Sequence, residues 1–238
     1  MSRVTTPAGP LTDTLISTSL KLWALWLIAL FAAIALTALA LFDVYPPGDV
    51  ALARTLQALR LPGLDWLSRF IYRIGASPID QLIALAVAVA IAIRRRPLMA
   101  TFVAVALLAR GFGGLLKELV ERPRPSPFLI DVSGRANGFA FPSGHVLGAV
   151  LLWGFIYFAS GELISSVRWR SWVRWTSLSI IALMGFQRVY AGAHWPSDVL
   201  GAYLWGGVIL FALVKAHELC GRCLFSAGAR KWAPISLG

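Results

Sequence analysis

The sequence has few charged residues and only two cysteines. Of its 238 residues, 14% are charged and 58% are hydrophobic, whereas about 25% of the residues of soluble domains are charged. This composition excludes a water-soluble enzyme of this size, and it excludes intrinsic disorder, which requires low hydrophobicity. Cys220 and Cys223 alone cannot build a disulfide-stabilised scaffold.

Acidic residues are also scarce. The chain has 11 Asp and Glu against 22 Lys and Arg, which gives a net charge of +11. An excess of positive charge is typical of proteins that bind nucleic acid, but in so apolar a chain a membrane accounts for it better. We therefore expect the lipid bilayer, and no nucleic acid, as a partner.

Long apolar segments take the place of the missing charges. A helix needs about 20 residues to cross the ~30 Å hydrocarbon core of a bilayer. The first segment has 21 residues without a charge, and the last three are shorter, but few polar residues remain to cover a globular surface. We predict an all-α polytopic membrane protein, a single domain over residues 1–238, with six transmembrane helices at Leu22–Phe42, Ile74–Ile93, Leu98–Leu116, Val146–Ser160, Trp175–Gln187 and Val199–Val214.

The basic residues predict how these helices are oriented. With a cytoplasmic N-terminus, the inner segments carry twelve basic and three acidic residues, a net +9, and the outer segments carry ten basic and eight acidic residues, a net +2. Tight basic clusters at 94–96 and 168–174 flank short inner loops, in line with the positive-inside rule. We therefore expect both termini in the cytoplasm.

Residues 46–73, between the first two predicted spans, are amphipathic. Leucines, Phe70 and Ile71 recur with arginines between them, and Pro62-Gly63 interrupts the pattern. This predicts short amphipathic helices on the outer membrane surface. As an alternative for the N-terminus, Ala38-Leu39-Ala40 looks like a signal-peptide cleavage site, but the apolar run before it is too long for a signal peptide.

Three polar clusters lie near the ends of the predicted spans, and the first is residues 117–125. Pro123 and Pro125 cannot continue a helix, so the chain must leave the third span here. Lys117 and Arg124 are then presented at the membrane surface. A basic span end that extends towards the lipid headgroups would have the same composition.

The second cluster, Phe141-Pro142-Ser143-Gly144-His145, directly precedes the fourth span. Ser143 is placed as the N-cap of that helix, where free backbone N–H groups and the positive end of the helix dipole bind anions. Gly144 lets a ligand approach the backbone closely. A capped helix start beside a histidine is also a common structural feature.

The third cluster, residues 188–198, connects the fifth and sixth spans. Pro196 suits the first turn of a helix, so Asp198 can reach back to His194 four positions earlier. A carboxylate bonded to one ring nitrogen fixes the tautomer and leaves the other nitrogen as a base or nucleophile. The same pairing would also satisfy a buried structural histidine.

The predicted spans bring all three clusters to the outer face of the membrane. Lys117, Arg124 and Arg188 would there meet a helix N-terminus and two of the three histidines of the chain. Phosphoryl transfer through a phosphohistidine requires this combination: cations that neutralise charge, a histidine nucleophile and a separate acid.

The spacing within the clusters resembles that of the type 2 phosphatidic acid phosphatase superfamily, which includes membrane lipid phosphatases and soluble vanadium haloperoxidases. The resemblance covers residues 117–198 and rests on three motifs: Lys117, six residues, then Arg124-Pro125; Pro142-Ser143-Gly144-His145; and Arg188, five residues, His194, three residues, Asp198. The third motif usually begins Ser-Arg and here begins Gln187-Arg188. This departure concerns substrate positioning more than the activity itself.

The resemblance implies a role for each matching residue. His194 would attack phosphorus and carry a covalent phosphate, Asp198 would orient His194, and His145 would protonate the departing oxygen. The phosphate oxygens would be held by five groups: Lys117, Arg124, Ser143, the Gly144 backbone N–H and Arg188. No metal and no other cofactor is implied, because the cations supply the electrostatic stabilisation.

The resemblance also implies an integral membrane lipid phosphatase. We expect it in a bacterial-type inner membrane, with the site facing the periplasm or the cell exterior. Polyprenyl diphosphate, such as undecaprenyl diphosphate, is the first candidate substrate, and phosphatidic acid, phosphatidylglycerol phosphate and lipid A phosphates present the same phosphate to the same cluster. A vanadate-dependent haloperoxidase and a non-enzymatic lipid transporter are the alternatives.

Further charged residues fall outside these roles. Arg110 and Glu118 lie in or near the third span, where each is expected to pair with an opposite charge on a neighbouring helix. Arg122 and Arg135 are expected in a solvated loop or in contact with headgroups.

Cys220 and Cys223 follow closely after His217. Three soft ligands on the cytoplasmic side are a weak indication of a metal site, which usually has four. We expect both thiols to be free in the reducing cytoplasm.

Overall fold

The computed structural model describes residues 10–42, 46, 48–59, 61–133 and 137–231 of the chain. These residues contain no strand, which agrees with the predicted all-α class. Their helices are α1 (Pro10–Leu41), α2 (Asp49–Gln57), α3 (Leu64–Gly75), α4 (Ile79–Ile93), α5 (Pro97–Ala109), α6 (Gly111–Val120), α7 (Gly144–Leu163), α8 (Val167–Tyr190) and α9 (Pro196–Lys231).

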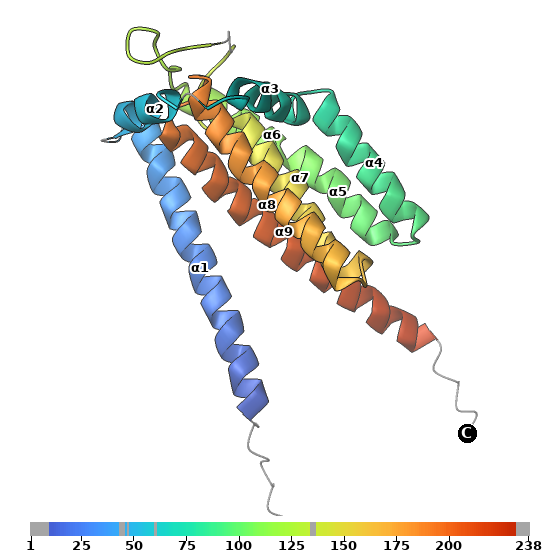
Figure 1. The fold of residues 1–238 in the computed structure, drawn as a ribbon. Coiled ribbons are helices and arrows are strands. Elements are labelled where there is room, and N and C mark those ends of the chain that lie inside the picture. Colours follow the sequence, from blue (N-terminus) through green and yellow to red (C-terminus); the bar gives the residue numbers. More distant parts are fainter. Residues whose placement is uncertain (1–9, 43–45, 47, 60, 134–136, 232–238) are drawn as a thin grey trace, which may run out of the picture.

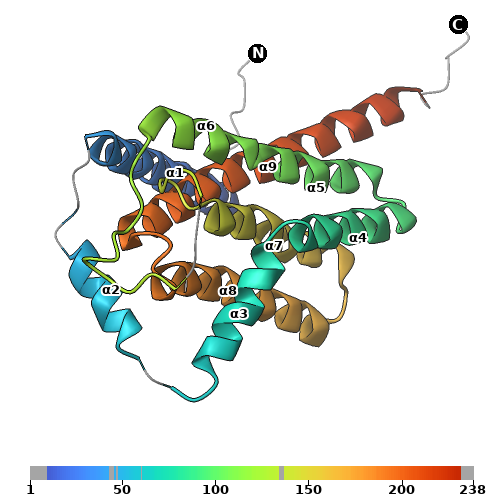
Figure 2. The same ribbon diagram turned by 90° about the horizontal axis from the view of Figure 1, so that it is seen from above.

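The long helices form a bundle around α7 (Figures 1 and 2). α7 packs against α8, α9 and α5, and its buried positions include Val146, Leu147, Leu151 and Phe155. α1 contacts α9, and α4 forms a hairpin with α5. α7 is therefore the only one of these helices that the others surround closely, and its N-terminus has a fixed place at one end of the bundle.

The predicted number of six transmembrane helices is only partly supported. Within the part of the chain that the structure describes, four helical segments are long and apolar enough to cross a bilayer: Leu20–Leu41, Pro97–Val120, Gly144–Leu163 and Pro196–Cys223. A fifth is reached only if α3 and α4 count as one broken span, and these two helices meet at a bend of 58°.

α8 and α4 fall short of this criterion for different reasons. α8 has 24 residues, but Arg168, Arg170 and Arg174 occupy its first turns and Arg188 its last, so its apolar part is short. α4 has only 15 residues because the helical segment that we predicted from Ile74 is divided. α3 ends at Gly75, and Pro78 precedes the new start at Ile79, as expected of a residue that cannot continue a helix.

The amphipathic segment forms the two short helices expected of it. α2 and α3 are separated at 58–63, where the sequence has Pro62-Gly63, and both lie across the end of the bundle at which α6 ends and α7 begins (Figure 1). On α3, Leu67 and Ile71 turn towards the core, whereas Trp66 and Phe70 are exposed and stack on each other. α3 thereby presents an aromatic edge outside the bundle.

The helix of the third predicted span is interrupted at a charged residue that has its expected partner. α5 ends at Ala109, α6 begins at Gly111, and Arg110 between them forms an ion pair with Asp80 in the first turn of α4. Such a pair is a common way to keep two charges within a membrane. Glu118 differs from the prediction, because it is exposed and has no ion-pair partner among the described residues.

The cysteine segment lies in the distal half of α9. Cys220 and Cys223 are exposed and are not bridged to each other, as expected. His217 instead turns inward between the rings of Phe102 and Phe158, with Nδ1 3.8 Å from the Glu162 carboxylate. His217 is therefore part of the packing of this end of the bundle.

Candidate active site

The three polar clusters meet at one end of the bundle. α6 ends at Val120, before the two prolines of the first cluster, and Glu121 has the left-handed conformation (φ 50°) that turns the chain away from the helix axis. α7 begins at Gly144 and α9 at Pro196, at the same end (Figure 1). The first turns of two helices and the last turn of a third therefore surround one space.

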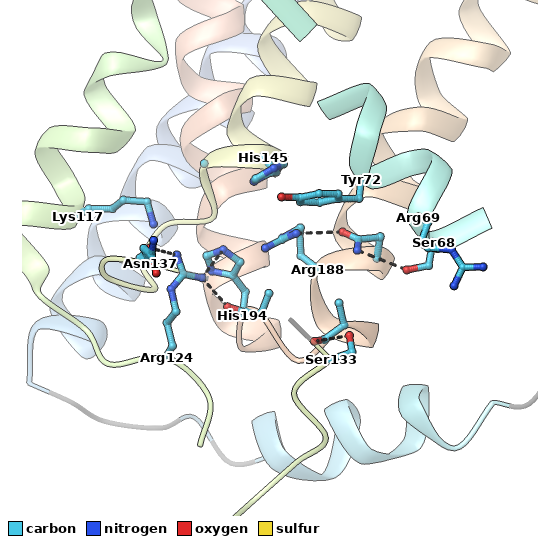
Figure 3. A pocket seen from close by; sticks show the side chains of 14 residues that line it. Ser68, Arg69, Tyr72, Lys117, Arg124, Ser133, Asn137, His145, Arg188 and His194 are labelled. Atoms are coloured by element: carbon cyan, nitrogen blue, oxygen red, sulfur yellow. Dashed lines mark hydrogen bonds between the residues drawn. The ribbon is translucent and has the colours of Figure 1, made fainter. Parts of the chain in front are cut away.

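This space is a cavity of about 530 Å³. Figure 3 shows Lys117 and Arg124 on one side of it and Tyr72 on the other, with His145, Arg188 and His194 between them. Six of the eight predicted site residues line the cavity: Lys117, Arg124, Gly144, His145, Arg188 and His194. Ser143 and Asp198 are fully buried directly behind it.

Backbone carbonyl groups hold Arg124 in the cavity wall. Its Nε donates to the carbonyl of Gly138 at 2.9 Å, and its terminal nitrogens donate to the carbonyls of Asn137 and Ala193, each at 2.8 Å. Nη1 also lies 3.3 Å from Nε2 of His194. The guanidinium is thus fixed beside the ring nitrogen that faces the cavity.

The other two predicted cations approach from different helices. Lys117 Nζ donates to the carbonyl of Phe139 at 2.7 Å, which uses one of its three N–H groups. Arg188, at the end of α8, is buried, and its Cζ lies 5.4 Å from the centre of the Tyr72 ring. Three positive charges from separate segments therefore face one cavity.

His145 lies in the first turn of α7. Its ring stacks on the ring of Tyr72, with the centroids 5.3 Å apart and the planes inclined by 25°. Tyr72 comes from α3, so the amphipathic segment supplies part of the cavity wall. The sequence contained no motif that pointed to Tyr72.

Ser143 is the N-cap residue of α7, as predicted from its position, but its side chain forms no capping hydrogen bond. Its Oγ is buried without a hydrogen-bond partner among the described residues. A buried hydroxyl of this kind is costly unless a ligand or water satisfies it. The backbone N–H of Ser143 donates to the carbonyl of Asp198 at 3.2 Å, which ties the second cluster to the third.

The predicted pairing of His194 with Asp198 is close but not a hydrogen bond. Asp198 Oδ2 lies 3.7 Å from His194 Nδ1, which exceeds hydrogen-bond length, and this oxygen accepts the backbone N–H of Trp195 at 2.9 Å. A movement of about 1 Å would bring the two groups into contact, and such bonds are often long in ligand-free sites.

His194 is 2% exposed. Burial lowers its pKa well below the usual 6.5, and the positive charges of three neighbours lower this pKa further: Arg188, Lys117 and Arg124. His194 is therefore neutral at physiological pH, and a neutral imidazole is the form that has a lone pair to attack with.

The lowered pKa of His194 predicts a loss of stability in acid. The unfolded chain takes up a proton at this residue below about pH 6.5 and the folded protein does not, so the free energy of unfolding falls as the pH is lowered from 6.5 towards the folded pKa. His194→Gln removes this contribution. We expect the melting temperature in detergent to fall less between pH 6.5 and 5 in the variant than in the parent, and parallel curves would contradict the assignment.

Arg122 overturns a prediction. It was expected in a solvated loop or at headgroups, but it is only 2% exposed, and it lies behind His194 rather than at the surface. Its Nη1 donates to Asp198 Oδ1 at 2.5 Å and to Ser197 Oγ at 2.8 Å. The turn at Glu121 directs this side chain inward. Arg135, which shared the prediction, lies outside the described residues.

Gln187 occupies the position where the motif usually has serine. It is buried, its Oε1 accepts a hydrogen bond from Arg188 Nη1 at 3.3 Å, and its Nε2 lies 3.4 Å from Ser68 Oγ on α3. The longer side chain therefore reaches from Arg188 to the helix that forms the cavity wall. The effect of this departure on substrate positioning stays a prediction.

Comparison with known proteins identifies the family. The profile of the PAP2 superfamily matches residues 98–222, more than half of the chain, and the chain belongs to this superfamily. It is 36% identical over 107 residues to phosphatidylglycerophosphatase B of Bacillus subtilis, a match that covers 44% of this chain and 50% of that protein. It is 31% identical over 134 residues to an undecaprenyl-diphosphatase of Sulfolobus acidocaldarius, covering 52% of this chain and 58% of that one.

A solved structure supports the fold. The crystal structure of a transmembrane PAP2-type phosphatidylglycerolphosphate phosphatase from Bacillus subtilis superposes with a TM-score of 0.66 at 23% identity, over 79% of this chain and 95% of that one. The chain spans about half the length of the curated relatives that it matches. Because the identity to the crystal structure is only 23%, that likeness concerns the arrangement of the helices alone.

Proposed function

We propose that this protein is a membrane lipid phosphatase that works through a phosphohistidine at His194. The observation that carries the proposal is one cavity, at the end of an apolar bundle, in which Arg124 lies 3.3 Å from the ring nitrogen of a neutral, buried histidine. Lys117, Arg188 and His145 line the same cavity. The names of the relatives, which include two different lipid phosphatases, support the same activity.

The reaction would proceed in two displacements. Nε2 of His194 attacks phosphorus, the bond from phosphorus to the lipid oxygen breaks, and His145 gives its proton to that oxygen. Water then attacks phosphorus and passes a proton to His145, the phosphorus–nitrogen bond breaks, and inorganic phosphate leaves. The first step leaves His194 phosphorylated and His145 without its proton, and the second step restores both residues, so the sum is hydrolysis of one phosphate ester or anhydride bond.

The positive groups would stabilise the charge of the transferred phosphoryl group. Lys117, Arg124 and Arg188 face its oxygens, and the N-terminus of α7 with Gly144 adds backbone N–H donors. Ser143 Oγ, buried and without a partner in the described structure, is a further donor within this wall. These groups come from the chain itself, so we expect the activity to require no added metal.

Polyprenyl diphosphate is the substrate that we favour. The cavity is lined by further polar groups beyond those that would hold the reacting phosphate, namely Arg69, Ser133 and Asn137. Arg69, on α3, is exposed and lines the cavity, and we propose that it meets a second phosphate group. The terminal phosphate of phosphatidic acid or of phosphatidylglycerol phosphate would fit beside His194 equally well. In these two lipids, however, no second phosphate is bonded directly to the phosphate that reacts.

We also propose that the site faces the outer side of a bacterial-type inner membrane and that α4 and α8 complete six crossings. The α4–α5 loop with Arg94–Arg96, and the first turns of α8 with three arginines, lie at the end of the bundle away from the cavity (Figure 1). Basic clusters of this kind remain in the cytoplasm. The described ends of α1 and α9, at Pro10 and Lys231, lie towards that side as well.

The function is tested by phosphate release from purified protein in detergent. Polyprenyl diphosphate, phosphatidic acid and phosphatidylglycerol phosphate are assayed side by side, with and without excess EDTA. We expect release that EDTA does not reduce, and the highest kcat/KM for the diphosphate. Release from none of these lipids would contradict the proposal; bromide oxidation with added vanadate would then favour a haloperoxidase, and lipid movement across vesicles would favour a transporter.

A further inference from the structure

A cluster of four buried polar side chains lies behind His194. It consists of Asp49 in the first turn of α2, Arg122 after α6, and Ser197 and Asp198 in the first turn of α9. All four are at most 5% exposed. We propose that Arg122 and Asp49 are positioning residues, which hold the Asp198 carboxylate in the orientation that His194 needs; this inference rests on the proposed function.

Arg122 connects three of these groups through one guanidinium. Nη1 donates to Asp198 Oδ1 at 2.5 Å and to Ser197 Oγ at 2.8 Å, and Nη2 lies 3.3 Å from Asp49 Oδ2. The side chain of Arg122 is 1% exposed and that of Asp198 is 0% exposed, so water does not screen the pair. Charged hydrogen bonds of this length are among the strongest in proteins.

Asp49 ties the same point of the structure to α2. Its Oδ1 accepts the backbone N–H of Ser197 at 2.9 Å, and its Oδ2 accepts the Ser197 hydroxyl at 2.5 Å. The first N–H groups of a helix have no partner within it, so this carboxylate satisfies a donor of α9 from another segment. Asp49 therefore fixes both the first turn of α9 and the far side of Arg122.

The consequence concerns the orientation of the Asp198 carboxylate. Arg122 occupies Oδ1 and the backbone N–H of Trp195 holds Oδ2, so the carboxylate cannot rotate, and Oδ2 remains directed at His194 Nδ1 at 3.7 Å. A buried carboxylate that loses its cation takes up a proton or turns to another donor. Either change would remove the negative charge that stabilises the phosphorylated, positively charged imidazole.

The far end of α2 is held in the same way. Gln57 Nε2 donates to the carbonyl of Asp131 at 2.7 Å and to that of Tyr190 at 3.2 Å, and Gln57 Oε1 accepts the N–H of Asp131 at 3.1 Å. α2 is thus fixed at both ends to the loops that carry the site. α2 is therefore part of the support of the site. A helix that only covered the surface would need neither the Asp49 contacts at its start nor the Gln57 contacts at its end.

The test uses Arg122→Gln, Arg122→Lys and Asp49→Asn in the full chain, with the exposed Arg73→Gln on α3 as the matched control. Outer residues that orient a reactive group typically affect activity about 10- to 100-fold. We expect Arg122→Gln to lower kcat by this factor with KM little changed, and to move the acid limb of the kcat/KM profile to higher pH. Arg122→Lys should recover much of the loss, Asp49→Asn should show a smaller loss of the same kind, and Arg73→Gln should behave as the parent.

Several outcomes would overturn the inference. Parental kcat in Arg122→Gln would do so, as would a loss of activity with an unshifted pH profile and no recovery in Arg122→Lys, which would indicate a purely structural residue. If Arg122→Gln does not fold, as judged by gel filtration in detergent, Asp49→Asn decides the matter by the same two readouts. Absence of phosphate release from the parent would instead refute the proposed function, so the two failures are distinguishable.

Discussion

Replacement of His194 with alanine is expected to lower phosphate release from the best lipid substrate by at least ~10³-fold, because it removes the residue that we propose forms the covalent intermediate. His194 is the buried, neutral ring that has a cation 3.3 Å from its Nε2. The measurement is the rate of inorganic phosphate release by detergent-purified protein that elutes as a single species. KM is secondary here, because the lost interaction exists only along the reaction path.

The third histidine of the chain provides the matched control. His217 is buried, as His194 is. It lies on α9 between Phe102 and Phe158, away from the cavity. His217→Ala should keep the parental rate even if its melting temperature falls. Full activity in His194→Ala, or an equal loss in both variants, would contradict the assignment of His194 as the nucleophile.

Replacement of His145 with alanine is expected to depend on the leaving group. A general acid contributes about 10²- to 10⁴-fold when the departing oxygen is a poor leaving group, as a lipid alkoxide is, and little when it is a good one. With p-nitrophenyl phosphate the first displacement should therefore survive in His145→Ala, whereas hydrolysis of the phosphohistidine should be slow. Rapid mixing should then show a burst of about one p-nitrophenol per protein, followed by slow turnover.

This pattern separates a proton donor from a residue that only shapes the cavity. His145 stacks on Tyr72, so its removal also leaves space against α3. Tyr72→Phe, which keeps the ring and removes the hydroxyl, controls for that packing and should retain the parental dependence on leaving group. An equal loss of the first turnover with lipid and with p-nitrophenyl phosphate would show that His145 does not act as the acid.

The sequence predicted the ends of the helices near the candidate site better than it predicted the number of spans. Lys117, Arg124 and His145 could be placed because each stands beside a local signal, a pair of prolines or a helix start, that fixes where a span ends. The number of spans depended on apolar length instead. α8 has a short apolar part and packs closely against α7. Such packing is a tertiary effect that the apolar length of a segment does not reveal.

Arg122 shows where local reasoning ends. It and Arg124 stand two residues apart, each followed by proline, and only the spacing from Lys117 in the family motif separates them. Their environments differ because Arg122 meets Asp49, 73 residues earlier in the chain, whereas Arg124 meets the backbone of 137–138 and Ala193. Contacts between distant segments of this kind determine which arginine lies in the cavity and which lies behind it.

The account depends above all on a covalent bond between phosphorus and His194, and trapping that intermediate tests it most directly. The parent protein is mixed with substrate, quenched in alkali within one turnover, digested and analysed by mass spectrometry. We predict a phosphate on the peptide that contains His194, stable in alkali, lost in acid and absent from His194→Ala. Continued turnover with no phosphorylated histidine at any quench time, or with the phosphate on another residue, would contradict the account.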